Sequence, residues 1–174
     1  MDKNDNIITE SPQNVITFYY TPTENSAYYA VHYMHEKLEP TDLEKGKGYA
    51  IDGSGIYEET GTHIEGIGDI GSDIPITPQV FAGFTLEADK AKTAIGGTEQ
   101  SGTLNLTDGK YIIKIDESGT ELYIFYERNI YDYVVEYRDY VYGDLLLKSK
   151  TVSGTKFGAT VEETAENISG YTCL

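Results

Sequence analysis

The chain has 174 residues, with 13 Lys and Arg against 29 Asp and Glu, which gives a net charge of −16. A protein this acidic, with no basic cluster, is repelled by nucleic-acid phosphates and by anionic membrane surfaces, so neither is expected as a partner. Tyrosine supplies 16 of the aromatic residues, beside five Phe and no Trp, and the abundance of strand-forming residues predicts a β-rich domain.

No apolar run reaches the ~18 residues that a membrane span needs, so membrane insertion is not expected. The first residues, MDKNDN, lack the apolar stretch of a signal peptide. The single cysteine, Cys173, cannot form a disulfide within the chain. This is compatible with a bacterial surface protein, which commonly does without disulfides.

The first pattern in chain order covers residues 8–20, ITESPQNVITFYY, and is typical of two strands joined by a tight turn. The segment 115–127, IDESGTELYIFYE, repeats it at an offset of 115 − 8 = 107, with Ile, Glu, Ser, Phe and Tyr at matching positions. We therefore interpret residues 1–20 as the terminal hairpin of a preceding repeat.

A half-buried strand is predicted over 29–34, where Tyr29, Val31 and Tyr33 alternate with Ala30 and His32. Residues 133–137 repeat this strand at an offset of 133 − 29 = 104. Two later matches, 70–74 with 157–161 and 81–85 with 168–172, share an offset of 170 − 83 = 87. The difference, 104 − 87 = 17 residues, predicts an insertion within 36–67 of the first copy.

The insertion is expected to form an extra β-hairpin, because the short apolar segments 49–51 and 56–58 flank the turn sequence DGSG. Long structured insertions are often where binding occurs. The candidate ligand-binding residues are therefore Tyr49, Ile51, Asp52 and Tyr57. The alternative is that the insertion only covers a sheet edge.

A short helix is predicted from Thr160, because Glu163 follows three residues later as in a capping box. The matching stretch of the first copy contains Pro75 and Pro78, which argues against a regular helix there. Strands are predicted over 110–115 and 121–126. The expected unit is a small mixed sheet with one short helix, an α+β and β-rich fold.

These elements divide the chain into residues 1–20, a complete repeat over 28–127 and the front half of a following repeat over 131–174. Repeats of this kind stack against their neighbours. The half unit lacks its closing strands, and residues 1–20 supply that type of strand. Head-to-tail self-association through 1–20 and 131–174 is therefore expected.

Neither a catalytic nor a metal site is expected from the single reactive side chains. Cys173 aligns with Leu86, which indicates a small buried packing residue, since no His that could act as a base is close in sequence. His32 aligns with Glu136 on the outer face, which indicates a solvated position and not a metal ligand.

Carboxylate clusters give weaker signals. The segments 69–73 and 52–55 could bind calcium, although neither matches the twelve-residue EF-hand loop and solvated turns are the alternative. The pairs 58–59 and 162–163 could suggest a glycosidase, but adjacent strand residues face opposite ways and Glu163 is expected to cap a helix. No enzymatic activity is predicted.

The order of these motifs resembles the mucin-binding-protein-like (MucBP-like) repeats of Gram-positive surface proteins. The resemblance rests on a tyrosine-rich first strand, an aliphatic-x-Gly-aromatic-Thr motif and a terminal strand rich in Ile, Phe and Tyr: residues 29–33, 81–85 and 122–126, with 133–137 and 168–172 in the second copy. It implies ubiquitin-like β-grasp modules in extracellular, cell-wall-associated adhesins, with host glycoproteins as ligands and no catalytic residues.

Two functions follow as hypotheses: an adhesin module that contacts a host surface glycoprotein or glycan, and a purely structural stalk that presents another domain. Mucins carry sialate and sulfate, so a protein with a charge of −16 receives no electrostatic steering toward them. Mucin contact would therefore depend on tyrosine stacking, hydrogen bonds or a bridging cation.

Overall fold

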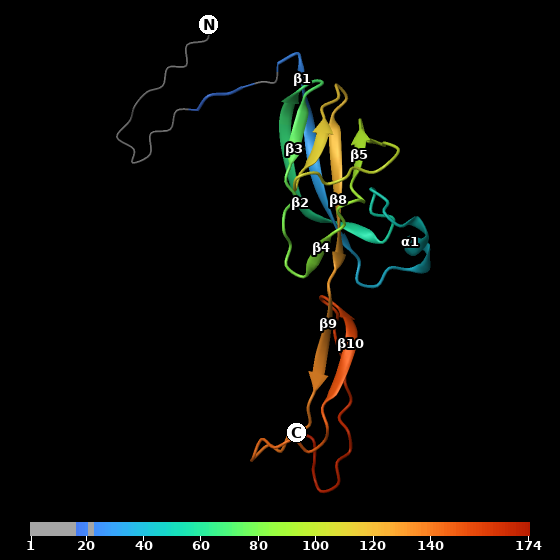
Figure 1. The fold of residues 1–174 in the computed structure, drawn as a ribbon, viewed down its shortest axis with the longest axis vertical. Coiled ribbons are helices and arrows are strands. Elements are labelled where there is room, and N and C mark those ends of the chain that lie inside the picture. Colours follow the sequence, from blue (N-terminus) through green and yellow to red (C-terminus); the bar gives the residue numbers. More distant parts are fainter. Residues whose placement is uncertain (1–16, 21–22) are drawn as a thin grey trace, which may run out of the picture.

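The structure, a computed structural model, describes residues 17–20 and 23–174 (Figure 1). The hairpin predicted over 8–20 lies outside the described residues except for 17–20. In these four residues the side chains of Phe18, Tyr19 and Tyr20 are exposed by 70%, 89% and 88%. Three large aromatic side chains are therefore in solvent at the start of the described chain.

The remaining elements are strands with one short helix, which confirms a β-rich α+β fold. In chain order they are β1 (Ser26–Glu36), α1 (Asp42–Lys47), β2 (Tyr57–Asp69), β3 (Asp73–Ile76), β4 (Phe84–Leu86), β5 (Lys92–Ile95), β6 (Thr98–Glu99), β7 (Tyr111–Lys114), β8 (Thr120–Arg128), β9 (Ile130–Val135) and β10 (Lys150–Lys156).

The main sheet has the strand order β2-β1-β8-β5-β6, and β4 pairs with the far end of β8. β1 is antiparallel to β2 but parallel to β8, with Val31 opposite Leu122. The two strands whose alternating patterns are strongest in the sequence thus meet at the centre of the sheet. Both side chains are fully buried, because a central strand is covered on each edge and each face.

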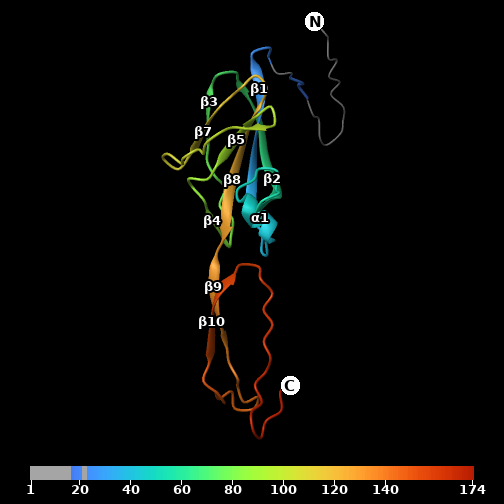
Figure 2. The ribbon, with the colours of Figure 1, turned by 90° about the vertical axis from the view of Figure 1, so that its right-hand side faces the viewer.

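The two faces of the main sheet carry separate cores. The two-stranded sheet of β3 and β7 covers one face, where Tyr111 and Ile113 join Val31 and Leu122 in the larger cluster. The connection between β1 and β2 covers the other face around Phe125. Figure 2 shows β3 with β7 and α1 on opposite sides of the sheet. Lys114 is exposed on β7, as its alternation with Ile113 and Ile115 predicts.

β9 and β10 form an antiparallel hairpin beyond the end of β8 (Figure 1). Its first two residue pairs repeat the register of β1 and β2, up to a bulge between Val152 and Thr155. Ser26 pairs with Asp69, and Ile130 pairs with Lys156, where 26 + 104 = 130 and 69 + 87 = 156. The strand pair β9–β10 is therefore related to β1–β2 by the offset of 104 on its first strand and by the offset of 87 on its second.

Hydrogen bonds around the hairpin repeat at the same offsets. The Ile70 N–H donates to the Asn25 carbonyl at 2.9 Å, and the Phe157 N–H donates to the Asn129 carbonyl at 2.8 Å. Gly83 and Gly170, related by 87, have φ of 82° and 84°, which is the left-handed conformation that glycine adopts at little cost. The turns that follow the two hairpins are therefore built alike.

The helix predicted from Thr160 is wrong, because residues 159–168 form no helix. The predicted cap residue Glu163 instead accepts hydrogen bonds from the Tyr133 hydroxyl, at 2.7 Å, and from Lys150 Nζ, at 2.9 Å. A capping box satisfies a helix end, but a helix this short needs a packed face as well. The segment 160–167 is exposed throughout.

The extra β-hairpin predicted for the insertion is also absent: residues 49–56 form turns and coil, and Tyr57 begins β2. β2 pairs with β1 along almost its whole length. Residues 57–67 are therefore the hairpin partner of the first strand, and the connection between β1 and β2 holds α1 instead. A real capping box starts α1, where Thr41 and Glu44 hydrogen-bond reciprocally.

Candidate functional site

Three of the four residues predicted to bind a ligand form a packed cluster under the β1–β2 connection. The Tyr49 ring stacks on Tyr57 with centroids 4.9 Å apart and meets Phe125 edge-on at 5.3 Å. Tyr57 is only 2% exposed, and Ile51 packs against the same cluster. The apolar pattern that predicted a binding hairpin therefore reflects a second small core, and Tyr57 is out of reach of a ligand.

The Tyr49 hydroxyl donates a hydrogen bond to Glu87 Oε2 at 3.1 Å, which ties the connection to the end of β4. Burial raises the pKa of Tyr49, and burial followed by the hydrogen bond with Tyr49 raises the pKa of Tyr57. Both hydroxyls therefore stay protonated at neutral pH. Asp52 alone of the four is exposed, with its carboxylate accepting the Ser54 N–H at 2.9 Å.

The Lys37 side chain holds the β1–β2 connection in place through hydrogen bonds. Its Nζ donates to Glu44 Oε1 at 2.6 Å and to the carbonyls of Gly53 and Gly55 at 2.8 and 2.9 Å. The hydrogen bond from Lys37, with those from Thr41, lowers the pKa of Glu44 to about 2. The Glu44 carboxylate therefore stays ionised at physiological pH.

A shallow hollow of about 450 Å³ lies beside this connection and includes Ile51 and Asp52 in its lining. Lys47 and Lys92 contribute positive charge to it, and Lys92 pairs with Glu99 at 2.6 Å. The hollow joins the exposed part of the predicted site to the edge of the main sheet. Hydroxyl-rich ligands could bind there through hydrogen bonds to these charged groups.

A buried ionic cluster joins the main sheet to the β9–β10 hairpin. Glu36, at the end of β1, is only 7% exposed. Its Oε2 accepts the Arg128 N–H at 3.0 Å, its carbonyl accepts Arg128 Nε at 2.6 Å, and its Oε1 pairs with Lys156 Nζ from β10. We call this cluster, with Gly83, Phe84, Asn129 and Phe157, the joint.

Aromatic and backbone contacts complete the joint. Arg128 Nη1 donates to the Phe157 carbonyl at 2.9 Å, and its guanidinium lies 5.0 Å from the Phe84 ring centroid. The Phe157 ring packs edge-on against Phe84 at 5.7 Å. Asn129 is the single residue between β8 and β9, and its N–H donates to the Gly83 carbonyl at 2.9 Å. The two parts are therefore connected by side chains as well as by the chain.

Sequence reasoning missed the joint. Glu36 lies 92 residues from Arg128 and 120 from Lys156, so no local pattern links the three. The one signal in the sequence was the shortness of the segment between the strand 121–126 and the strand that starts near 133, which indicates closely held units.

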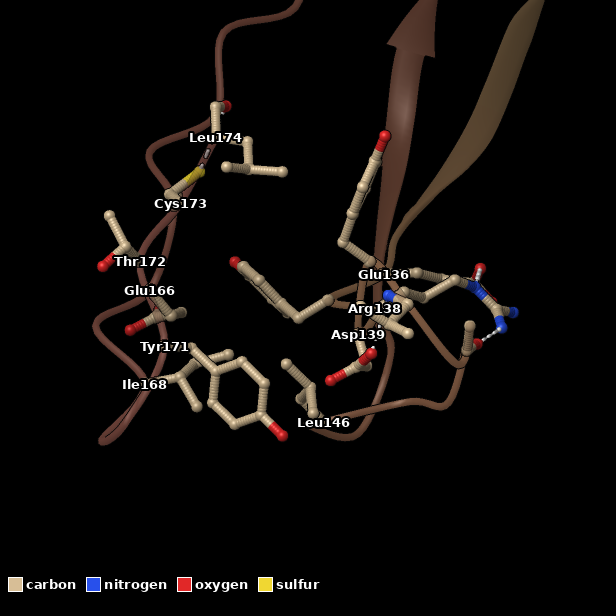
Figure 3. Close-up of a pocket in the computed structure, with 15 residues that line it drawn as sticks. Glu136, Arg138, Asp139, Leu146, Glu166, Ile168, Tyr171, Thr172, Cys173 and Leu174 are labelled. Atoms are coloured by element: carbon tan, nitrogen blue, oxygen red, sulfur yellow. Dashed lines mark hydrogen bonds and ion pairs between the residues drawn. The ribbon is translucent and has the colours of Figure 1, made fainter.

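A larger cavity of about 740 Å³ lies between the end of the β9–β10 hairpin and the C-terminal coil (Figure 3). Figure 3 shows Ile168, Tyr171 and Cys173 on the coil facing the side that carries Asp139 and Leu146. Cys173 is exposed, which corrects its prediction as a buried packing residue. Its counterpart Leu86 packs against the main core, whereas Cys173 has no strand equivalent to β8 above it among the described residues.

The histidines lie on β1 and β2. His32 Nδ1 is 2.7 Å from Glu59 Oε1, and its ring stacks on Tyr123 with centroids 4.6 Å apart, so it is half-buried and not freely solvated. Across 17–20 and 23–174, no group of three or more His, Cys, Asp or Glu side chains is placed to hold a metal ion. The two segments considered for calcium form turns closed by Ser72 and Ser54.

Comparisons with known proteins gave no match: no family model, no curated protein and no solved structure is similar to this chain. Within the described part of the chain, no helix is both long and apolar enough to span a membrane.

Proposed function

We propose that this chain is a non-catalytic segment of a repeat-containing bacterial surface protein, and that it acts as a structural spacer that holds neighbouring units in a fixed orientation. The observation that carries the proposal is the joint. A flexible connection between domains is polar and makes few contacts, whereas here a buried carboxylate binds Arg128 on one side and Lys156 on the other.

The strand order supports a β-grasp fold for the first unit. In a β-grasp the first strand lies between its antiparallel hairpin partner and a parallel later strand, which is the arrangement of β2, β1 and β8. Where a β-grasp fold has a helix packed on the sheet, this unit has β3 and coil. The repeated first pairs of the hairpin and the repeated turn hydrogen bonds support residues 130–174 as the front part of a second such unit.

An adhesin role is the second candidate, supported by the hollow that holds Asp52 beside Lys47 and Lys92. Its hydrogen-bonding groups suit the hydroxyls of a host glycan. The net charge of −16 opposes capture of sialylated or sulfated mucins at long range. The spacer role is therefore the one that the geometry favours.

Binding to immobilised mucin and to a glycan array distinguishes the two candidates. The spacer role predicts no binding above background for the whole chain. An adhesin role predicts binding that is lost in the double variant Lys47→Ala and Asp52→Ala and kept in the control Lys150→Ala, which removes a lysine far from the hollow. Such selective loss would overturn a purely structural function.

A further inference from the structure

The 740 Å³ cavity corresponds to the place of one core side chain of the first unit. There Tyr126 is 1% exposed, its ring lies 5.0 Å from Phe81 and 6.2 Å from Tyr33, and its hydroxyl donates to the Gln79 carbonyl at 2.8 Å. Adding 104 or 87 to these neighbours gives Tyr137, Ile168 and Glu166, and all three line the cavity. The cavity therefore has the surroundings of a Tyr126 side chain without that side chain.

The strand edge beside the cavity is open in the same way. β1 pairs with β2 on one side and β8 on the other, whereas β9 pairs with β10 alone in the part of the chain that the structure describes. Val31 is fully buried, while its counterpart Val135 is half-buried and the neighbouring Val134 is 56% exposed. An open edge with apolar side chains is a template for an added strand.

Residues 17–20 carry the sequence that fits this place. At the offset of 107, Phe18 matches Phe125 and Tyr19 matches Tyr126, and both are exposed. We propose that this segment of a second copy of the chain lies as a parallel strand alongside residues 137–140, in line with the open edge of β9, with the Tyr19 side chain in the cavity. The proposal rests on the repeat relationship argued under Proposed function.

The register between β1 and β8, shifted by the repeat offsets, gives the expected pairing of residues 17–20. Tyr33 lies opposite Ile124 and His35 opposite Tyr126, so Thr17 lies opposite Tyr137 and Tyr19 opposite Asp139. The Tyr19 hydroxyl then donates to the Glu166 carbonyl, as the Tyr126 hydroxyl does to Gln79. The buried ring and this hydrogen bond together select tyrosine at position 19.

Residues 17–20 cannot reach the cavity of their own copy. Tyr19 precedes Ser26 by seven residues, which span at most about 25 Å. The eleven residues of β1 extend about 36 Å in the direction of the joint, and the cavity lies beyond the joint at the end of β9. Figure 1 places residues 17–20 and the C-terminal part at opposite ends of the molecule.

Association of this kind is head-to-tail. Each copy offers its N-terminal segment to the next copy and its cavity to the previous one, so the contact does not close on itself. The products are open chains of increasing length. This arrangement would continue the spacer beyond a single molecule.

Sedimentation velocity under reducing conditions, over a range of protein concentrations, tests the proposal, with alkylation of the single Cys173 as a second readout. We expect the mass to rise above 19.3 kDa in steps, and the alkylation rate to fall as the cavity fills. Loss of the buried ring in Tyr19→Ser should weaken association about tenfold or more. Tyr20→Ser is the matched control, because its counterpart Glu127 is exposed on β8.

A monomer at all concentrations, or equal effects of Tyr19→Ser and Tyr20→Ser, would overturn the proposal. A synthetic peptide of residues 115–127 separates the cavity from its occupant. If that peptide protects Cys173 from alkylation while whole chains do not associate, the second copy is the wrong occupant. Either failure leaves the spacer function standing, because that function is tested on the monomer.

Discussion

Single tyrosines perform much of the packing in this protein. Tyr33, Tyr57, Tyr111 and Tyr126 are all at most 2% exposed. The Tyr111 hydroxyl donates to the Ala88 carbonyl at 3.0 Å, and burial raises the pKa of Tyr111 to about 12. Tyr111 and Tyr126 each join a strand to a connection, because the ring fills the core and the hydroxyl donates to a loop carbonyl. Four of the 16 tyrosines are thus buried core residues.

Tyr33 and Tyr126 allow the contribution of a buried tyrosine hydroxyl to stability to be tested. The buried Tyr33 hydroxyl has no hydrogen-bond partner in the described structure, whereas the Tyr126 hydroxyl donates to Gln79. Tyr33→Phe should leave the free energy of unfolding unchanged or raise it by up to about 1 kcal/mol, and Tyr126→Phe should lower it by about 1 kcal/mol. Urea unfolding measures both, and the reverse order of stabilities would refute this account of the two hydroxyls.

His35 gives the fold a pH dependence. Its ring stacks on Phe84 with centroids 3.9 Å apart, and burial, with the nearby Arg128, lowers the pKa of His35 to about 4. As pH falls from 6.5 toward 4, His35 becomes protonated in the unfolded chain but stays neutral in the folded protein. His35 therefore leaves stability intact above pH 6.5 and lowers it by about 2–3 kcal/mol near pH 4.

The measurement for His35 is urea unfolding at pH 7.5 and pH 4 for the wild type and His35→Phe. We expect the variant to lose less stability than the wild type over this range. His63→Phe, at a more exposed histidine on β2, is the control and should follow the wild type. A variant His35→Phe with the same loss as the wild type would mean that His35 accepts its proton in the folded state.

At the scale of elements, the strands could be predicted and their surroundings could not. The alternation around Val31 and Leu122 identifies β1 and β8, since both strands obey a two-residue period. The same method failed at 49–56, because Tyr49 and Ile51 lie in a connection and pack against the cluster around Phe125 without pairing as a strand. A two-residue period says nothing of whether an apolar segment packs as strand or as loop.

The surroundings of the candidate site residues could not be predicted either. Asp52 and Tyr57 were both predicted to bind a ligand, but Asp52 is exposed and Tyr57 is buried. The alignment of Cys173 with Leu86 predicted a buried residue, but Cys173 is exposed, because residues 23–174 supply no strand that covers it. Repeats therefore predict position in the fold, while exposure depends on neighbours that are distant in sequence.

The joint predicts that one arginine makes a large contribution to the free energy of unfolding. Arg128→Met removes the side chain whose Nε and Nη1 donate to the carbonyls of Glu36 and Phe157, so two charge-assisted hydrogen bonds across the joint are lost. The loss of stability should be about 3 kcal/mol. Lys92→Met, which breaks a pair at the sheet edge, is the control and should cost below about 1 kcal/mol. Equal effects in thermal and urea unfolding would contradict a structural role for the joint.

The aromatic part of the joint can be tested at two equivalent glycines. Gly83→Ala and Gly170→Ala carry the same backbone penalty of about 1–2 kcal/mol, because both glycines have positive φ. A methyl group at Gly83 would also lie 2.3 Å from the Phe157 ring, whereas none of the described atoms lies within 4 Å of that position at Gly170.

Gly83→Ala should therefore displace Phe157 and increase hydrogen exchange at the Phe157 and Asn129 amides, which bind across the joint. Gly170→Ala should leave these two amides protected. Exchange followed by NMR reports each amide separately. Unchanged protection in Gly83→Ala would show that Phe157 is not needed to hold the hairpin.

For the whole molecule, the joint converts two small sheets into one elongated body. Figures 1 and 2 show the β9–β10 hairpin continuing in the direction of β8 in both views. Asn129 alone separates the two strands, and the contacts of Glu36 and Phe157 restrain rotation at that residue. A spacer needs this restraint, because a freely rotating connection would not project what it carries.

The distance between the two units in the monomer tests this claim most directly. Spin labels at Glu58→Cys on β2 and Ser153→Cys on β10, in a Cys173→Ser background, are both at exposed positions, and dilute samples keep the chain monomeric. Pulsed electron paramagnetic resonance should give one narrow distance distribution, which broadens in Arg128→Met and stays narrow in Lys92→Met. A broad distribution in the protein without a joint substitution would contradict the spacer function.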